Sequence, residues 1–164
     1  MSAAPTSKRQ VALADLLVRL AFITKANGYN TDAGAAIFAG EAPRFGPDDA
    51  PAALAVFVGD DSPEIKGGIV RTDVPIEVWA TVPAGLDSPL MAIEETIADI
   101  RVAVEIEKDG SVDRSLGVVE GLPATLPTGL RRGPTRPLRR EPGSEFVGAS
   151  VEYVAMFETR WGTP

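Results

Sequence analysis

Residues 145–161, EFVGASVEYVAMFETRW, decide the fold, because apolar and polar side chains alternate along them. Successive side chains of a β-strand point to opposite faces, so this period of two predicts a long strand with one apolar face. The residues expected on that face are Val147, Ala149, Val151, Tyr153, Ala155 and Phe157. Residues 76–82 repeat the pattern, with Ile76, Val78, Ala80 and Val82 on one face and Glu77, Trp79 and Thr81 on the other.

A helix is predicted directly after the second of these strands. Ser88 precedes Pro89, and this pair suits a helix start, since Ser satisfies free N–H groups and Pro is tolerated at the first helical position. The apolar residues that follow fall on one arc of a helix, which we expect to be buried: Leu90, Ile93, Ile97, Ile100 and Val104. Glu94, Glu95 and Asp99 are expected to face away from the core.

The N-terminal region predicts another helix, from the capping box of Ser7 and Gln10 to about Asn27. Its core stripe consists of Leu13, Leu16, Leu17, Leu20 and Ile23. A second apolar strip lies on the opposite side and consists of Val11, Val18 and Phe22. Packing on one sheet leaves this strip in water, so we expect it to contact another subunit. The alternative is that a few exposed apolar residues are normal on any monomer.

The segment NGYNTDAG, residues 27–34, ends this helix, and it is either a binding loop or a helix terminus with a turn. Gly28 suits the left-handed position after a helix, where a Cβ atom is penalised. Tyr29 is expected to fold back onto the last turn, and Asn30, Thr31 and Asp32 supply turn chemistry. The sequence therefore favours a structural turn over an active site.

The remaining apolar stretches predict further strands, at residues 35–40, 52–58 and 69–82. A helix, several strands, a second helix and a last strand are typical of a two-layer α+β fold, with a mostly antiparallel sheet packed by two helices. The length of 164 residues and the 45% apolar content suit a single domain over residues 1–164.

Residues 121–145 differ in composition from the rest of the chain. Five prolines and four glycines in 25 residues argue against a helix or a central strand, so the sequence predicts a long loop inserted in the domain. The loop holds Arg131, Arg132, Arg136, Arg139 and Arg140. Guanidinium groups pair with carboxylates and phosphates, so we expect these arginines to contact a charged partner. The alternative is a mobile, solvated segment.

Composition narrows the range of activities. The chain has no cysteine and no histidine, which excludes thiolate or imidazole metal sites and catalytic triads based on histidine. We therefore expect no catalytic residues, no metal and no cofactor. The net charge of −7 disfavours general binding to DNA or anionic membranes, and the apolar run near the N-terminus is interrupted by Asp15 and Arg19. The chain is expected to be soluble and unexported.

The order of these pieces resembles the tail terminator proteins of long-tailed bacteriophages, the family of minor tail protein U of lambda-like phages. The resemblance covers most of the chain and rests on a first helix ending in NGYNTDAG, a strand like PIEVWATV, a helix like IEETIADIRVAV and an end reading WGTP. Gly28 and Tyr29, with Thr31 and Gly34, carry it most distinctively.

The resemblance implies a structural, non-enzymatic virion protein of the tail and neck, assembled in the host cytoplasm. A hexameric ring of such subunits caps the tail tube, ends tube polymerisation and offers a head-joining surface to a head–tail connector or neck protein. A ring needs two different complementary patches on each subunit. Val11, Val18 and Phe22 are predicted for one patch and Trp79 for the other, while the five arginines are predicted to contact the tube or a neighbouring subunit.

Three other functions remain open at this point. The chain resembles in size and residue content another neck component, such as a head–tail connector or tail completion protein. A nucleic-acid-binding module would use the arginines on phosphates alone, because no aromatic residue lies within residues 121–145. An enzyme would have to rely on carboxylates such as Asp60 and Asp61, or Glu94 and Glu95.

Overall fold

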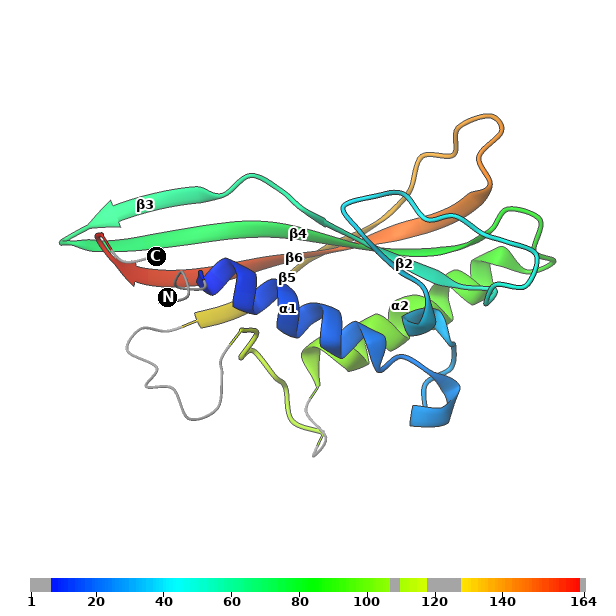
Figure 1. The fold of residues 1–164 in the computed structure, drawn as a ribbon, viewed down its shortest axis with the longest axis horizontal. Coiled ribbons are helices and arrows are strands. Elements are labelled where there is room, and N and C mark those ends of the chain that lie inside the picture. The colour runs from blue at the N-terminus through cyan, green and yellow to red at the C-terminus, as the bar shows by residue number, and fades with distance from the viewer. Residues whose placement is uncertain (1–6, 107–109, 118–127, 163–164) are drawn as a thin grey trace, which may run out of the picture.

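The protein is a two-layer α+β fold, in which two helices cover one face of a six-stranded sheet (Figure 1). The computed structural model describes residues 7–106, 110–117 and 128–162. The fold class predicted from the sequence is confirmed.

The centre of the sheet is a pair of 15-residue antiparallel strands, β4 (Ile69–Pro83) and β6 (Phe146–Arg160). β2 (Ala53–Val58) pairs with one half of β4, and β3 (Ser62–Lys66) pairs with the other half in a hairpin. β1 (Ile37–Ala39) adds to β2 in parallel, and β5 (Thr128–Pro137) pairs with β6 at the opposite edge. The sheet is therefore mostly antiparallel, with strand order β1-β2-β4-β6-β5.

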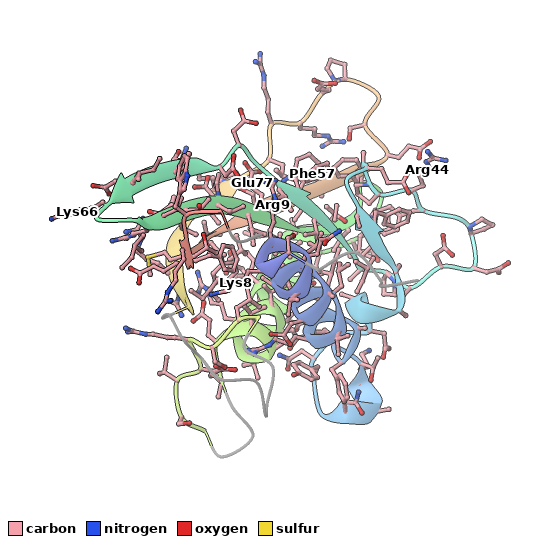
Figure 2. The ribbon with its side chains drawn as sticks, turned by 60° about the vertical axis from the view of Figure 1, so that its left-hand side comes forward. Lys8, Arg9, Arg44, Phe57, Lys66 and Glu77 are labelled. Carbon is pink, nitrogen blue, oxygen red and sulfur yellow. The ribbon has the colours of Figure 1, made fainter. Side chains whose placement is uncertain are left out.

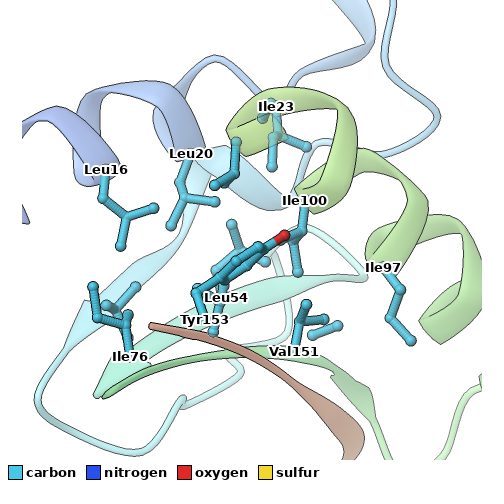
Figure 3. Packing of buried hydrophobic residues seen from close by; sticks show 14 of the residues in the cluster. Leu16, Leu20, Ile23, Leu54, Ile76, Ile97, Ile100, Val151 and Tyr153 are labelled. Atoms are coloured by element: carbon cyan, nitrogen blue, oxygen red, sulfur yellow. The ribbon is translucent and has the colours of Figure 1, made fainter. Parts of the chain in front are cut away.

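The core lies between the sheet and helices α1 (Lys8–Ala21) and α2 (Pro89–Glu105). Val78 and Val151 are paired across β4 and β6 at the centre of the sheet, and both are fully buried. The helix side of the core consists of Leu16 and Leu20 of α1, Ile23 shortly after α1, and Ile97 and Ile100 of α2. These side chains pack against the strands (Figure 3). The predicted apolar faces of both long strands are thus the faces that the helices cover.

The capping box of Ser7 and Gln10 is present, with both reciprocal hydrogen bonds. The prediction that this helix continues to about Asn27 is wrong, since α1 ends at Ala21. A separate 3-10 turn, Lys25–Asn27, follows, and Gly28 closes it with a φ of +89°. The left-handed glycine was predicted correctly, because it follows from local backbone sterics.

Two predictions about the face of α2 are wrong. Leu90, expected to be buried, is exposed in the first turn, where α2 reaches past the core. Asp99, expected to face water, is one of the most buried polar side chains, at 2% exposure. The periodicity of a helix does not show that a buried carboxylate will find hydrogen-bond donors on another element.

The prediction of a continuous loop over residues 121–145 is also wrong. Residues 128–137 form β5, while residues 121–127 lie outside the described part of the chain. The register shifts between Arg132 and Thr135, so Gly133 and Pro134 sit in a bulge. Proline is tolerated at a bulge on an edge strand, because its missing N–H costs no ladder hydrogen bond there.

Candidate interaction surfaces

The NGYNTDAG segment is held in place by Asp99 of α2. One carboxylate oxygen accepts from the backbone N–H and side-chain amide of Asn30, at 3.0 and 2.9 Å. The other accepts from the backbone N–H and hydroxyl of Thr31, both at 2.8 Å. Gly34 packs against the end of α1, where a Cβ atom would lie 2.8 Å from the carbonyl oxygen of Ile23. Thus Thr31 and Gly34, which carry the resemblance, have a structural role here, because their contacts hold the turn after α1 in place.

Two residues of the apolar strip predicted on the first helix, Val18 and Phe22, border a groove on the outside of the helix layer, whereas Val11 is not part of its lining. The groove has a volume of about 500 Å³ and is lined by Val18, Arg19, Phe22, Tyr29, Ala103, Ile106 and Asp113. Val18 and Phe22 are 59% and 54% exposed, and Val11 is half-buried. Val18, Phe22 and Ile106 therefore form an apolar surface on the side of the helices that faces away from the sheet.

A cluster of ion pairs supports this groove from beneath. The Arg19 guanidinium donates to the carboxylates of Asp15 and Asp113 and to the carbonyl oxygen of Val104, joining α1 to α2 and to the segment after it. Burial alone would raise the pKa of Asp113, but hydrogen bonds from Ser115 and Arg19 outweigh it and lower the pKa. Two carboxylates share one guanidinium, which leaves the cluster with one negative charge in excess.

The other predicted interface residue, Trp79, lies on the face of the sheet that the helices leave uncovered. Its ring centroid is 4.5 Å from that of Phe57 and 6.3 Å from that of Phe146, and its indole N–H donates to Glu77 at 3.0 Å. A hollow of about 580 Å³ adjoins Trp79 and Phe146 and is bounded by the turn between β5 and β6. Trp79 and the strip on α1 are therefore on opposite sides of the molecule.

The structure separates the five predicted arginines into different environments. On the uncovered face, Arg131 is 4.0 Å from Asp73 and Arg136 is 3.3 Å from Glu152. Arg139 and Arg140 are exposed in the turn between β5 and β6, and within the described part of the chain neither has an ion-pair partner.

Arg132 has a structural role on the helix side of the sheet. It binds the Glu105 carboxylate with two nitrogens, one at 2.8 Å, and the Tyr153 hydroxyl donates to the same carboxylate at 2.8 Å. Burial alone would raise the pKa of Glu105, but the hydrogen bonds from Arg132 and Tyr153 outweigh it and lower the pKa. Burial and the nearby Glu105 charge raise the pKa of Tyr153. Arg132 therefore fastens β5 to the end of α2.

A third surface was not predicted from the sequence. One end of the sheet extends beyond the N-terminal end of α1 (Figure 1), and we call this part of the sheet the arm. The arm consists of β3, residues 69–73 of β4 and residues 156–160 of β6. Lys66 lies at its free end (Figure 2), beside the two-residue turn of Gly67 and Gly68. A Gly-Gly pair between two strands is a hairpin signal, so this element was within reach of sequence analysis.

The free end of the arm is apolar. Ile65 and Trp161 are 57% and 68% exposed, and Ile69 is exposed as well. Ile65 and Ile69 occupy opposite faces of the hairpin by register, and the backbone N–H of Trp161 donates to the carbonyl oxygen of Gly68 at 2.9 Å. These side chains make the tip of the arm a wedge with apolar residues on both sides.

The carboxylate pairs considered for catalysis are not brought together as a site. Asp61 forms an ion pair with Arg9 at 3.6 Å, and Glu94 and Glu95 are exposed on α2. Among the described residues no group of acidic side chains has the arrangement of a metal site. Neither helix of that same part of the chain has the length and apolar character needed to cross a membrane.

Comparison with known proteins adds no relative: no family model and no curated protein matches this chain.

Proposed function

We propose that this protein is a structural virion component, a tail terminator that forms a ring on the end of the tail tube. The ring, which we take to be hexameric, ends tube polymerisation and presents the head-joining surface to a connector or neck protein. In this proposal the protein has no enzymatic role and acts in the tail and neck of the virion. The order of elements and the NGYNTDAG segment support it through the resemblance described above.

The observation that carries the proposal is the apolar groove on the outside of the helix layer. Val18 and Phe22 are more than half exposed, although α1 and α2 already bury one face each against the sheet. Monomeric soluble proteins rarely expose a large contiguous apolar surface, so such a surface usually marks an interaction site. A second and different surface, around Trp79, lies on the uncovered side of the sheet. A ring of identical subunits needs two different complementary surfaces on each subunit, and we propose the groove as one of them.

The arginines favour a protein partner over a nucleic acid. Arg131, Arg132 and Arg136 each have a carboxylate of this chain within ion-pair distance, so these carboxylates would compete with phosphates for them. Arg139 and Arg140 have no ion-pair partner among the described residues. Arg139 borders the hollow beside Trp79, and Arg140 is the next residue in the same turn. We propose that these two arginines, with the surface around Trp79, contact the acidic side chains of the tail tube or a neighbouring subunit.

Electron microscopy of negatively stained particles tests the proposal. The purified protein is mixed with tail tubes polymerised from the tube protein of the same virion, and rings should cap one end of each tube and stop its growth. Particles that leave the tubes bare but bind the portal complex would assign the chain to a connector instead. Binding to DNA that weakens steeply with salt would assign it to the nucleic-acid class.

The role of the arginines has its own variant. Replacing all five would remove the partner of Glu105 and disturb the fold, so Arg132 is kept. Arg139→Ser with Arg140→Ser should weaken tube capping, while Lys25→Ser with Arg114→Ser removes the same charge from exposed positions away from the hollow and should not. Equal capping by both variants would reject the proposed contact.

A further inference from the structure

We propose that the tip of the arm of one copy inserts into the groove between α1 and the end of α2 of a neighbouring copy. The tip consists of Ile65, Lys66, Ile69 and Trp161, and the groove is bordered by Val18, Phe22 and Ile106. This inference rests on the proposed ring assembly, for which it names the contact between subunits.

Shape supports this pairing of surfaces. The tip is convex, since it is a two-residue hairpin turn at the end of three strands, beyond the N-terminal end of α1 (Figure 1). The groove is concave, with a volume of about 500 Å³, which lies within the range of pockets that hold side chains or small ligands. A convex tip and a concave groove are complementary in shape, so a contact between them joins unlike surfaces, as the interfaces of a ring do.

Apolar character supports it as well. Ile65 and Ile69 lie on opposite faces of the hairpin, so water contacts both in a single copy. Insertion between two helices is the arrangement that removes both faces from water at once. The groove offers an isoleucine, a valine and a phenylalanine for these contacts. Burial of such side chains is a main source of favourable association energy.

Charge is also complementary between the two surfaces. Lys66 is the last residue of β3, beside the turn at the end of the arm (Figure 2). The groove is lined by Asp113 and Arg19, and the cluster of these two residues with Asp15 has one negative charge in excess. An ammonium group delivered to this position by the tip would add a second cation to a cluster of two carboxylates and one guanidinium group. The electrostatic term would help to select the orientation of the tip.

Cross-linking between chains tests the contact, and the chain suits this method because it contains no cysteine. Ile65→Cys with Val18→Cys places one thiol on the tip and one on the border of the groove. A short bismaleimide should link chains of this variant into a ladder on a denaturing gel. The control is Ile65→Cys with Leu90→Cys, because Leu90 is exposed and apolar but lies outside the groove. It should give at most background linkage.

The outcomes separate this inference from the proposed function. A ladder that closes at six chains supports both, and a product that stops at two chains supports the contact but contradicts a ring. No linkage between Ile65→Cys and Val18→Cys, or linkage equal to that of the control, overturns the inference. Tube capping by a protein without this linkage would leave the proposed function standing and place the subunit contact elsewhere.

Substitution gives a second, independent measurement. Ile65→Glu and Phe22→Glu each place a charge in the contact, and each should weaken self-association about tenfold or more in analytical ultracentrifugation. Both positions are exposed in the single copy, so the variants should fold as the wild type does. Leu90→Glu is the matched control and should leave association unchanged. Unchanged association in the first two variants would overturn the inference.

Discussion

Replacing Asp99 with alanine should remove a large share of the protein's stability. The carboxylate accepts four hydrogen bonds from Asn30 and Thr31, and it is 2% exposed. Asn30 is exposed, so its donors can turn to water in the variant. Thr31 is buried, so its backbone N–H and its hydroxyl would lose their partner at a position with little access to solvent.

The magnitude follows from these two buried donors. An unsatisfied buried polar group costs about 1–3 kcal/mol, so two of them should lower the free energy of unfolding by about 2–6 kcal/mol. Native domains have about 5–15 kcal/mol in total, so the variant should fold only marginally or need low temperature. Asp99→Asn keeps one acceptor oxygen but turns an amide N–H₂ toward donors, and it should cost less than the alanine variant.

Urea unfolding followed by circular dichroism measures this effect, with Glu95→Ala as the control on the exposed side of the same helix. The control should remain within about 0.5 kcal/mol of the wild type, as is usual for surface substitutions. Thr31→Val with Asp99→Ala should cost less than the sum of the two single changes, because they remove the same interaction. Additive costs, or an Asp99→Ala variant as stable as the control, would refute this account of the turn.

Three further predictions concern other contacts. Because the pKa of Glu105 is lowered on folding, its charge stabilises the protein fully above the ordinary glutamate pKa of 4.5, and this contribution is lost as the pH falls through the lower folded-state pKa. The difference in unfolding free energy between wild type and Glu105→Gln, measured from pH 7 downward, should therefore shrink in that acid range. A constant difference would contradict this prediction. Gly34→Ala should destabilise by about 1–3 kcal/mol through overpacking, whereas Gly85→Ala, which meets no atom within 4 Å, should not, and equal melting temperatures would disprove the close approach. Arg132→Ala should lower stability more than Arg136→Ala, since Glu105 is less exposed than Glu152, and the reverse order in urea unfolding would count against a fastening role for Arg132.

The parts of the fold that obey local rules were predictable from the sequence. The capping box of Ser7, the left-handed Gly28 and the alternation along β4 and β6 all depend on residues within a few positions of one another. Their physical causes are backbone sterics, unpaired N–H groups at a helix start and the two-residue period of a strand. These rules hold wherever the segment lies in the molecule.

The environment of the candidate surfaces was predictable in part. The exposure of Val18 and Phe22 follows from their position opposite the core stripe of α1. The five arginines read as one basic segment in the sequence, but β5 directs Arg131 and Arg136 to one face of the sheet and Arg132 to the other. Their separation depends on the pairing of β5 with β6. The proline content of the segment argued against a strand there, so this pairing was not predicted.

The sequence by itself determined the fold class, the two helices and the two long central strands, because each of these is encoded in the periodicity of its own residues. Tertiary structure alone decided that Asp99 is buried beneath a turn 68 residues away, that β5 completes the sheet, and that Ile106 and Asp113 join Val18 and Phe22 in one groove. These features depend on which elements meet across long separations in the chain. The partners of Asp99 and the pairing of β5 with β6 are set by these long-range contacts, and no local pattern of residues contains them.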